Sequence, residues 1–256
     1  MSKPTIRRLV AYIIDAIIVA LIASALSRVS FLNPRMEAYD KMEDEYTEIL
    51  LEARNDPKKA SELMSDEKVN DLTYELAYNG MYMNICTIVV TCLYFVVFQY
   101  YTKGATLGRK LLKIQLISRD GKDVSMLQLL KRSIIINSLL TGTILIIFIS
   151  LMSKEAYIKY ASYVQLFEYG LVFLSCGFVI YRDDGVGLHD LFAGTRVILA
   201  SEKDKYLKSL NDNKVKEAVV VEENELEEDI VEPKKVVKKT TTKKKSTSKK
   251  TLKKDK

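Results

Sequence analysis

Apolar residues in this 256-residue chain gather in four blocks, and the segments between the blocks are rich in charge. A soluble domain would instead interleave apolar and charged residues at helical or strand period. About 20 apolar residues suffice to cross a hydrocarbon core of about 30 Å. The blocks therefore predict an all-α membrane protein with four transmembrane helices, over about residues 9–26, 81–101, 133–153 and 161–181.

The first block contains an aspartate, Asp15, near its middle, and Arg8 lies seven residues before it. Seven residues is almost two helical turns, so both side chains fall on one face of a helix. A carboxylate at that depth costs roughly 2.5–3.5 kcal/mol on insertion scales, so we expect Asp15 to face protein or water. A cleaved signal peptide ending near Ala23-Ser24-Ala25 is the competing interpretation, but the length of the block and its internal aspartate favour an uncleaved span.

The distribution of basic residues predicts the orientation of the chain. Three Lys/Arg precede the first span, and residues 102–132 carry eight Lys/Arg and two acids. The loop of residues 27–80 carries seven basic residues and thirteen acids. Because Lys and Arg concentrate in cytoplasmic connections, both termini are predicted to be cytoplasmic and the 27–80 loop extracytoplasmic.

The inserted loop is rich in Glu, Lys, Ala, Leu and Met, a composition that predicts helix. Asp56-Pro57 divides it into two helical segments, because the residue before a proline is pushed out of the α region. Three interpretations stay open: a helical hairpin that covers the extracytoplasmic face, a mobile charged loop, and helical extensions of the flanking spans.

From residue 201 to residue 256 the composition predicts a charged, disordered cytoplasmic tail. Residues 217–232 hold eight acids and no base, and residues 234–256 hold twelve Lys with no Arg and no aromatic residue. Such a composition cannot bury enough apolar surface to offset its ordering entropy. The lysine-rich half could stay solvated, bind anionic lipid or contact nucleic acid, and the lack of Arg and aromatic residues argues against nucleic acid.

The cytoplasmic connections predict a short amphipathic helix. Thr106 is expected to cap it, with Arg109, Lys110 and Lys113 facing headgroups and Ile114 facing acyl chains together with two leucines. Residues 114–118 predict a short strand that enters a tight turn, and residues 195–200 are likewise strand-like. We expect these two strands to pair, which would tie the middle connection to the C-terminal segment.

Three stretches, taken in order, resemble the RDD family of bacterial integral membrane proteins. They are residues 8–15 (Arg-Leu-Val-Ala-Tyr-Ile-Ile-Asp), 104–114 (Gly-Ala-Thr-Leu-Gly-Arg-Lys-Leu-Leu-Lys-Ile) and 187–195 (Gly-Leu-His-Asp-Leu-Phe-Ala-Gly-Thr). The resemblance covers about residues 5–200, apart from the 27–80 loop. It implies that Arg8, Asp15 and Asp190 are the residues for which the family is named, and that the chain lies in a bacterial cell membrane. Transport has been suggested for the family without a settled activity.

The candidate site residues are Arg8, Asp15, Asp190 and the second intramembrane acid, Glu168. They could form a buried charge network that only orients helices, bind a cation or relay a proton, or cap helix ends without touching. His189 is the single histidine, and the three cysteines match no ligand spacing, so neither a metal site nor a cofactor is predicted. The chain shows no nucleophile–base pair and no phosphate-binding glycine loop, which argues against an enzyme.

The leading functional hypothesis is movement of a monovalent cation or proton through a polar site centred on Asp15. The alternative is a membrane scaffold that recruits partners through the outer loop and the tail. Four spans enclose only a narrow path, so a homo-oligomer would suit transport. The predicted partners are otherwise the lipid bilayer and, through the lysine-rich tail, anionic lipid.

Overall fold

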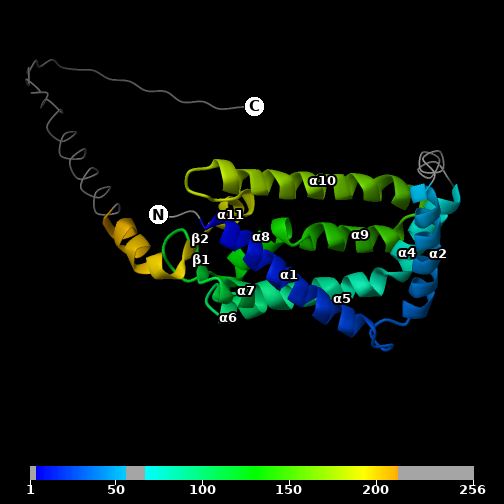
Figure 1. Cartoon of the computed structure of the whole chain (residues 1–256), viewed down its shortest axis with the longest axis horizontal. Helices are drawn as coiled ribbons and strands as arrows, with labels where there is room; N and C mark the ends of the chain where they lie inside the picture. The colour runs from blue at the N-terminus through cyan, green and yellow to red at the C-terminus, as the bar shows by residue number, and fades with distance from the viewer. Residues whose placement is uncertain (1–3, 56–66, 213–256) are drawn as a thin grey trace, which may run out of the picture. The chain divides into compact units, whose positions relative to one another are not determined.

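The computed structural model describes residues 4–55 and 67–212 (Figure 1). Three helical segments in this part are long and apolar enough to cross a membrane, and they match the first, second and fourth predicted spans. They are helix α1 (Thr5–Ser27), the continuous run of α5 (Met81–Cys92), the π-helical turn η2 (Leu93–Phe98) and α6 (Gln99–Tyr101), and helix α10 (Lys154–Tyr181).

The third predicted span, residues 133–153, is not one straight helix. It is divided between α8 (Met126–Ile136) and α9 (Leu139–Leu151), which are bent by 65° at their break. Ser138 causes the break because its φ of 57° lies in the left-handed region, outside helical geometry. The described residues therefore contain three candidate spans, or four if the bent pair counts as one.

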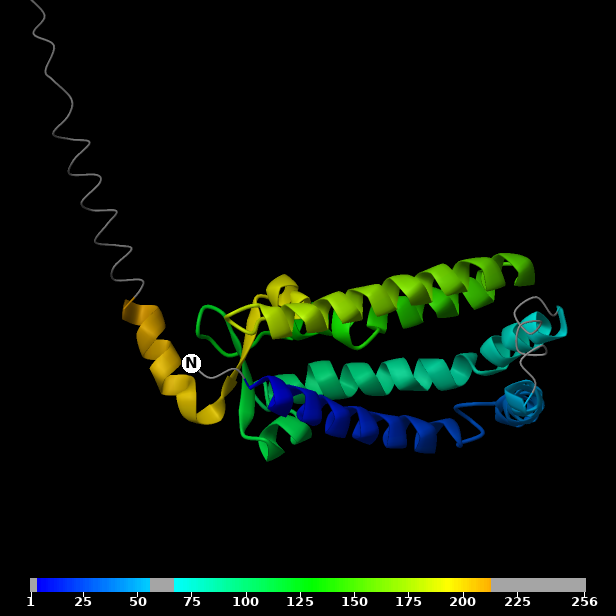
Figure 2. The same cartoon turned by 45° about the horizontal axis from the view of Figure 1, so that its top comes forward.

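The long helices run side by side in Figures 1 and 2, where α1 contacts α5, α5 contacts α9, and α9 contacts α10. The inner face of α1 repeats every four residues, as a helix stripe does, and consists of Ala11, Asp15, Val19, Ala23 and Ser27. Apolar side chains cover the outer faces of α1 and α10, and Phe173 keeps 82% of its side chain exposed. These outward apolar faces suit contact with lipid chains.

The inserted loop forms two packed helices, α2 (Met36–Asn55) and α4 (Glu67–Asn79), as predicted. The guanidinium of Arg35, just before α2, lies 3.9 Å from the ring centre of Tyr78 on α4 and donates to its hydroxyl at 2.9 Å. Helix α4 also contacts α9 and α10, so the pair packs on the bundle end away from the strands (Figure 1). The predicted break at Asp56-Pro57 lies outside the described residues.

The predicted strand pairing is confirmed. Strands β1 (Ile114–Ser118) and β2 (Thr195–Leu199) form an antiparallel ladder in which Leu116 lies opposite Val197, and both residues are buried. Packing of Leu116 and Val197 with Ala11 joins the ladder to the first span.

The predicted short helix is α7 (Leu107–Leu111), and the Thr106 hydroxyl accepts from the backbone N–H of Arg109 at 3.4 Å. The predicted orientation of two side chains in and after this helix is wrong. Arg109 is 8% exposed and Ile114 is 2% exposed, so both point into the protein rather than toward headgroups and acyl chains. Lys110 and Lys113 do lie exposed.

Ordered structure continues beyond residue 200, where the tail was predicted to begin. The 3₁₀ turn η3 (Ala200–Glu202) leads into a helix over residues 203–212. Tyr206 is buried against Ile117 and Ile198 of the two strands, and its hydroxyl donates to the carbonyl of Arg119 at 3.0 Å. The acidic and lysine-rich stretches of the predicted tail lie in residues 213–256, outside the described residues.

Candidate functional site

Asp190 lies in the short helix α11 (Leu188–Ala193) and is completely buried. Arg8 from α1 and Arg132 from α8 both form ion pairs with its carboxylate. Thr195 donates its hydroxyl to the same carboxylate at 3.1 Å. The sequence left open whether Arg8 and Asp190 touch, and in the structure they form an ion pair. The Asp190 cluster (Arg8, Arg132, Asp190, Thr195) joins α1, α8, α11 and β2.

His189 lies beside this cluster and is 4% exposed. Its Nε2 is 3.4 Å from the Asp190 carboxylate, and its Nδ1 contacts the Ser175 hydroxyl on α10. Burial, and then the positive charges of Arg132, Arg8 and Arg109, lower the pKa of His189 well below its usual value. A neutral ring with its proton on Nε2 fits both contacts, because Nε2 then donates to Asp190 and Nδ1 accepts from Ser175.

Asp15 is 1% exposed and is bound by a separate set of groups. The hydroxyls of Tyr94 and Thr106 donate to its carboxylate at 2.6 and 2.5 Å, and the backbone N–H of Gly108 donates at 2.8 Å. We name these four residues the Asp15 cluster. All three donors are uncharged, and within the described residues Asp15 forms no ion pair, so Asp15 and Arg8 share a helix face without pairing.

The Asp15 cluster depends on local backbone features of two neighbouring segments. Tyr94 lies in the π-helical turn η2, and π-turns of this kind often occur at functional sites. A Cβ atom on Gly108 would lie 2.4 Å from the carbonyl oxygen of Ala11 and 3.0 Å from the Asp15 carboxylate. Glycine at this position therefore permits α7 to lie directly on α1.

Arg109 is the third buried arginine, next to the Asp15 cluster. Its guanidinium donates to the carbonyl of Gly104 at 3.4 Å, and the Gln99 side chain accepts from it when the amide oxygen is turned toward Arg109. Burial lowers the pKa of Arg109 to about 10, and the negative charge of Asp15 acts in the opposite direction. Asp15 is thus the main source of negative charge that Arg109 experiences.

The buried charges do not balance. The buried Arg109 and Arg132, together with Arg8, whose side chain is 11% exposed, supply three positive charges. Asp15 and Asp190 supply two negative charges, and the neutral His189 adds none. Taking ions out of water is costly, so a buried ion network is weak evidence of stability by itself. An excess of positive charge also makes this region unfavourable for a multivalent cation.

Glu168, the fourth predicted site residue, is not hydrogen-bonded to a residue of either cluster. It accepts a hydrogen bond from Ser138, at the break between α8 and α9. No group of three or more His, Cys, Asp or Glu that could hold a metal ion occurs in residues 4–55 and 67–212.

Several residues of the two clusters were not predicted from the sequence. Arg132 was counted only as a cytoplasmic charge, although its place with Leu129 and Ser133 on one helical face is the pattern of a buried stripe. Thr106 and Gly108 belong to the family-like glycine-rich stretch, which was a signal for their importance. Tyr94 sits in an uninterrupted apolar and aromatic run, and nothing in that run distinguishes it from a lipid-facing tyrosine.

The apolar helices, the arginine–aspartate ion pairs of the Asp190 cluster and the buried carboxylate of the Asp15 cluster define a helical membrane protein with a polar interior. The RDD family model matches residues 3–194, well over half of the chain, so this protein belongs to the RDD family. The match includes the Asp15 cluster and, apart from Thr195, the Asp190 cluster. Comparisons with curated proteins and with solved structures found no match.

Proposed function

We propose that this RDD-family membrane protein moves a proton or a monovalent cation across the membrane, with Asp15 as the exchanging carboxylate. The observation that carries the proposal is that Asp15 is buried near the middle of α1 and is bound by uncharged donors only. An ionisable residue at such a position is by default a candidate for an ion or proton pathway.

The arrangement gives protonation of Asp15 a direct structural consequence. An ionised carboxylate only accepts hydrogen bonds, whereas a protonated one donates through one oxygen. Proton uptake would therefore require Tyr94 or Thr106 to reorient, and it would remove the negative charge that offsets Arg109. Because Asp15 also holds the N–H of Gly108, this change would loosen the contact of α7 with α1.

A monovalent cation could use the same groups. The carboxylate of Asp15 and the hydroxyl oxygens of Tyr94 and Thr106 are hard oxygen ligands of the kind that alkali and alkaline-earth ions prefer. The surplus buried arginine disfavours higher charge, so a proton or a singly charged ion fits better than a divalent ion.

The proposal includes the orientation of the protein across the membrane. Both termini and the end with β1 and β2 would face the cytoplasm, and the α2–α4 pair would lie outside a bacterial cell membrane. The support is the excess of Lys and Arg before α1 and in residues 102–132, compared with the acidic 27–80 loop.

A flux measurement on the purified full chain in liposomes tests the proposal. Proton movement is followed with an enclosed pH-sensitive dye under an imposed Na⁺ or K⁺ gradient, for wild type and Asp15→Asn. We expect flux in wild type and its loss in Asp15→Asn, while the matched control Glu168→Gln, the other intramembrane acid, retains flux. Equal flux in wild type and Asp15→Asn, or no flux in either, would refute it.

A scaffold is the second candidate, and the α2–α4 pair favours it. The Arg35–Tyr78 contact and the ion pair of Lys68 with Glu45 give this pair a defined surface outside the spans. Stoichiometric co-purification with another membrane protein, lost on Arg35→Ala and unchanged in Asp15→Asn, would support the scaffold in place of transport.

A further inference from the structure

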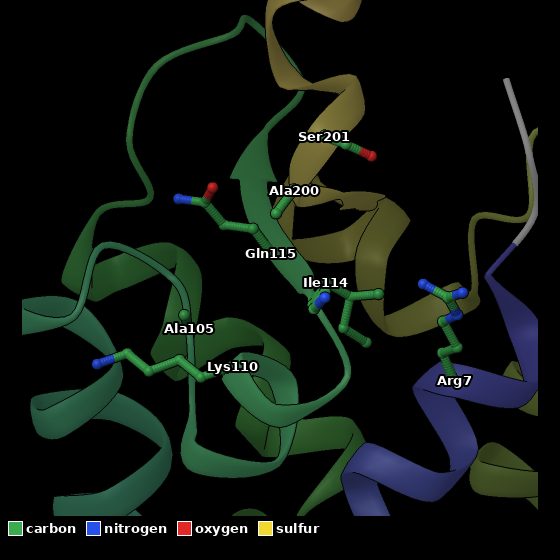
Figure 3. A pocket seen from close by; sticks show the side chains of 8 residues that line it. Arg7, Ala105, Lys110, Ile114, Gln115, Ala200 and Ser201 are labelled. Carbon is green, nitrogen blue, oxygen red and sulfur yellow. The ribbon is translucent and has the colours of Figure 1, made fainter.

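A pocket opens where the first turn of α1, helix α7, the start of β1 and the turn η3 meet (Figure 3). Its volume is about 450 Å³, within the range of roughly 300–1,000 Å³ that is usual for small-molecule sites. Its lining includes the basic residues Arg7, Lys110 and Lys113 and the polar residues Gln115 and Ser201, and none of its lining residues is acidic.

The three basic side chains come from separate parts of the chain. Arg7 lies on α1 and Lys110 on α7, and in Figure 3 their side chains stand on opposite sides of the pocket. Lys113 follows α7 with a φ of 54°, and its carbonyl accepts from the backbone N–H of Ala200 at 2.9 Å. The pocket therefore brings together basic side chains from three parts of the chain. The backbone at Lys113 is fixed by its hydrogen bond to Ala200.

The surroundings of the pocket indicate which kind of anion would occupy it. Arg7 is flanked on α1 by the exposed apolar residues Ile6 and Leu9, and α7 exposes Leu107 and Leu111 next to Lys110. Basic side chains next to exposed apolar side chains at the end of a span are typical of the boundary between lipid headgroups and acyl chains. A soluble anion would gain nothing from the apolar side chains, whereas a lipid would contact both.

We propose that this pocket binds the phosphate-bearing headgroup of an anionic phospholipid. Arg7, Lys110 and Lys113 pair with the phosphate and its neighbouring charge, Gln115 and Ser201 supply hydrogen bonds, and the lipid chains lie along Leu107 and Leu111. The site is separate from the Asp15 and Asp190 clusters and does not depend on the proposed transport.

Native mass spectrometry of the full chain in nonionic detergent tests this site. Short-chain phosphatidylglycerol, phosphatidylcholine and inorganic phosphate are titrated separately. We expect a single phosphatidylglycerol to bind at low concentration, with at least about tenfold weaker binding of the other two. Equal binding of phosphatidylcholine, or of inorganic phosphate, would contradict a site for an anionic lipid.

The matched comparison uses two triple variants that remove the same charge. Arg7→Gln, Lys110→Gln and Lys113→Gln empty the pocket of positive charge, while Lys122→Gln, Lys205→Gln and Lys208→Gln change exposed lysines elsewhere on the described surface. We expect the pocket variant to bind phosphatidylglycerol at least about tenfold more weakly and the control to bind as wild type does. Binding that is unchanged in the pocket variant, or equally weakened in both, would show that the pocket does not hold the lipid.

Two single variants distinguish a loss of lipid binding from misfolding of the triple variant. Lys110 and Lys113 are exposed, so Lys110→Gln and Lys113→Gln leave the core intact. Each is expected to weaken phosphatidylglycerol binding by a few-fold, because each lysine contributes about one favourable contact with the lipid charge. Wild-type affinity in both single variants would overturn the assignment as well.

Discussion

The two buried aspartates of this protein are held in opposite ways. Asp190 forms ion pairs with two arginines from two different helices, and it also accepts from a threonine hydroxyl and contacts His189. Asp15 is equally buried, but two hydroxyls and one backbone N–H bind it. The same residue type is therefore held in two ways: the ion pairs of Asp190 join helices, whereas Asp15, in the proposed function, carries a charge that a proton or a cation cancels.

The two aspartates also differ in the cost of neutralising the carboxylate. Neutral Asp190 would leave Arg8 and Arg132 buried without a negative partner, and an uncompensated buried charge is very costly. Neutral Asp15 would leave hydroxyls that can reorient to accept as well as donate. Loss of the Asp15 charge would also remove the negative charge that acts on Arg109, but it would break no ion pair. We therefore expect the Asp15 cluster to accept both charge states more readily than the Asp190 cluster, and the predictions below test this contrast.

The largest effect is expected from Asp190→Asn. Removing one partner of a buried ion pair typically costs about 3–5 kcal/mol, so this variant should lose most of its folding stability. Thermal unfolding in detergent, followed by circular dichroism, measures the change. The exposed Asp204→Asn is the control, and an Asp190→Asn variant as stable as that control would remove the distinction between the clusters.

Gly108→Ala is expected to cost about 1–3 kcal/mol, because the new methyl group would overlap the Ala11 carbonyl oxygen and force α7 away from α1. Flux should fall in parallel, since Asp15 loses its backbone donor. The control is Gly177→Ala in α10, where nothing lies within 4 Å of the added Cβ. If the two alanine variants melt at the same temperature, the close approach of α7 to Asp15 is not important.

Folding stability is expected to decrease as the pH falls below about 6.5, the usual pKa of histidine. The folded protein keeps His189 neutral because its pKa is lowered, while the unfolded chain takes up a proton there. The unfolded state then binds more protons, so stability is present above the unfolded pKa and is lost as the pH decreases, by about 2 kcal/mol near pH 5. Unfolding free energies at pH 7.5 and 5 measure this, and His189→Gln should flatten the dependence. An unchanged slope in the variant would mean that His189 is not the group responsible.

Asp15→Asn should have the smallest effect on stability, about 1 kcal/mol. The amide oxygen still accepts a hydrogen bond, and the loss is the difference between a charged and a neutral acceptor. The same unfolding experiment measures the change. A loss as large as that of Asp190→Asn would mean that Asp15 is a structural anchor too.

Much of the fold was predictable, because long apolar runs and short strand-like segments next to turns are local properties. The spans containing Asp15 and Glu168, the helices of the inserted loop and the strand pair all follow from such patterns. A contact of Arg8 with Asp190 was one of the alternatives that the sequence left open, since both residues lie at the same end of the spans. The break at Ser138 was not predicted, since a left-handed serine within an apolar run carries no local signal.

The composition of the site was less predictable than the spans. Periodicity shows which residues share a face of one helix, but it does not show which faces meet. Arg109 and Arg132 were expected among the headgroup or cytoplasmic charges, and both are buried because the partners that compensate them come from distant segments.

Infrared difference spectroscopy of the full chain in liposomes, between high and low pH, tests the contrast between the two aspartates most directly. A protonated carboxyl group has a C=O band that an ionised one lacks. We expect a buried carboxyl band to appear at low pH in wild type, to persist in Glu168→Gln, and to be absent in Asp15→Asn. An undiminished band in Asp15→Asn, or no band in wild type, would contradict the role of Asp15 as the carboxylate that changes its charge.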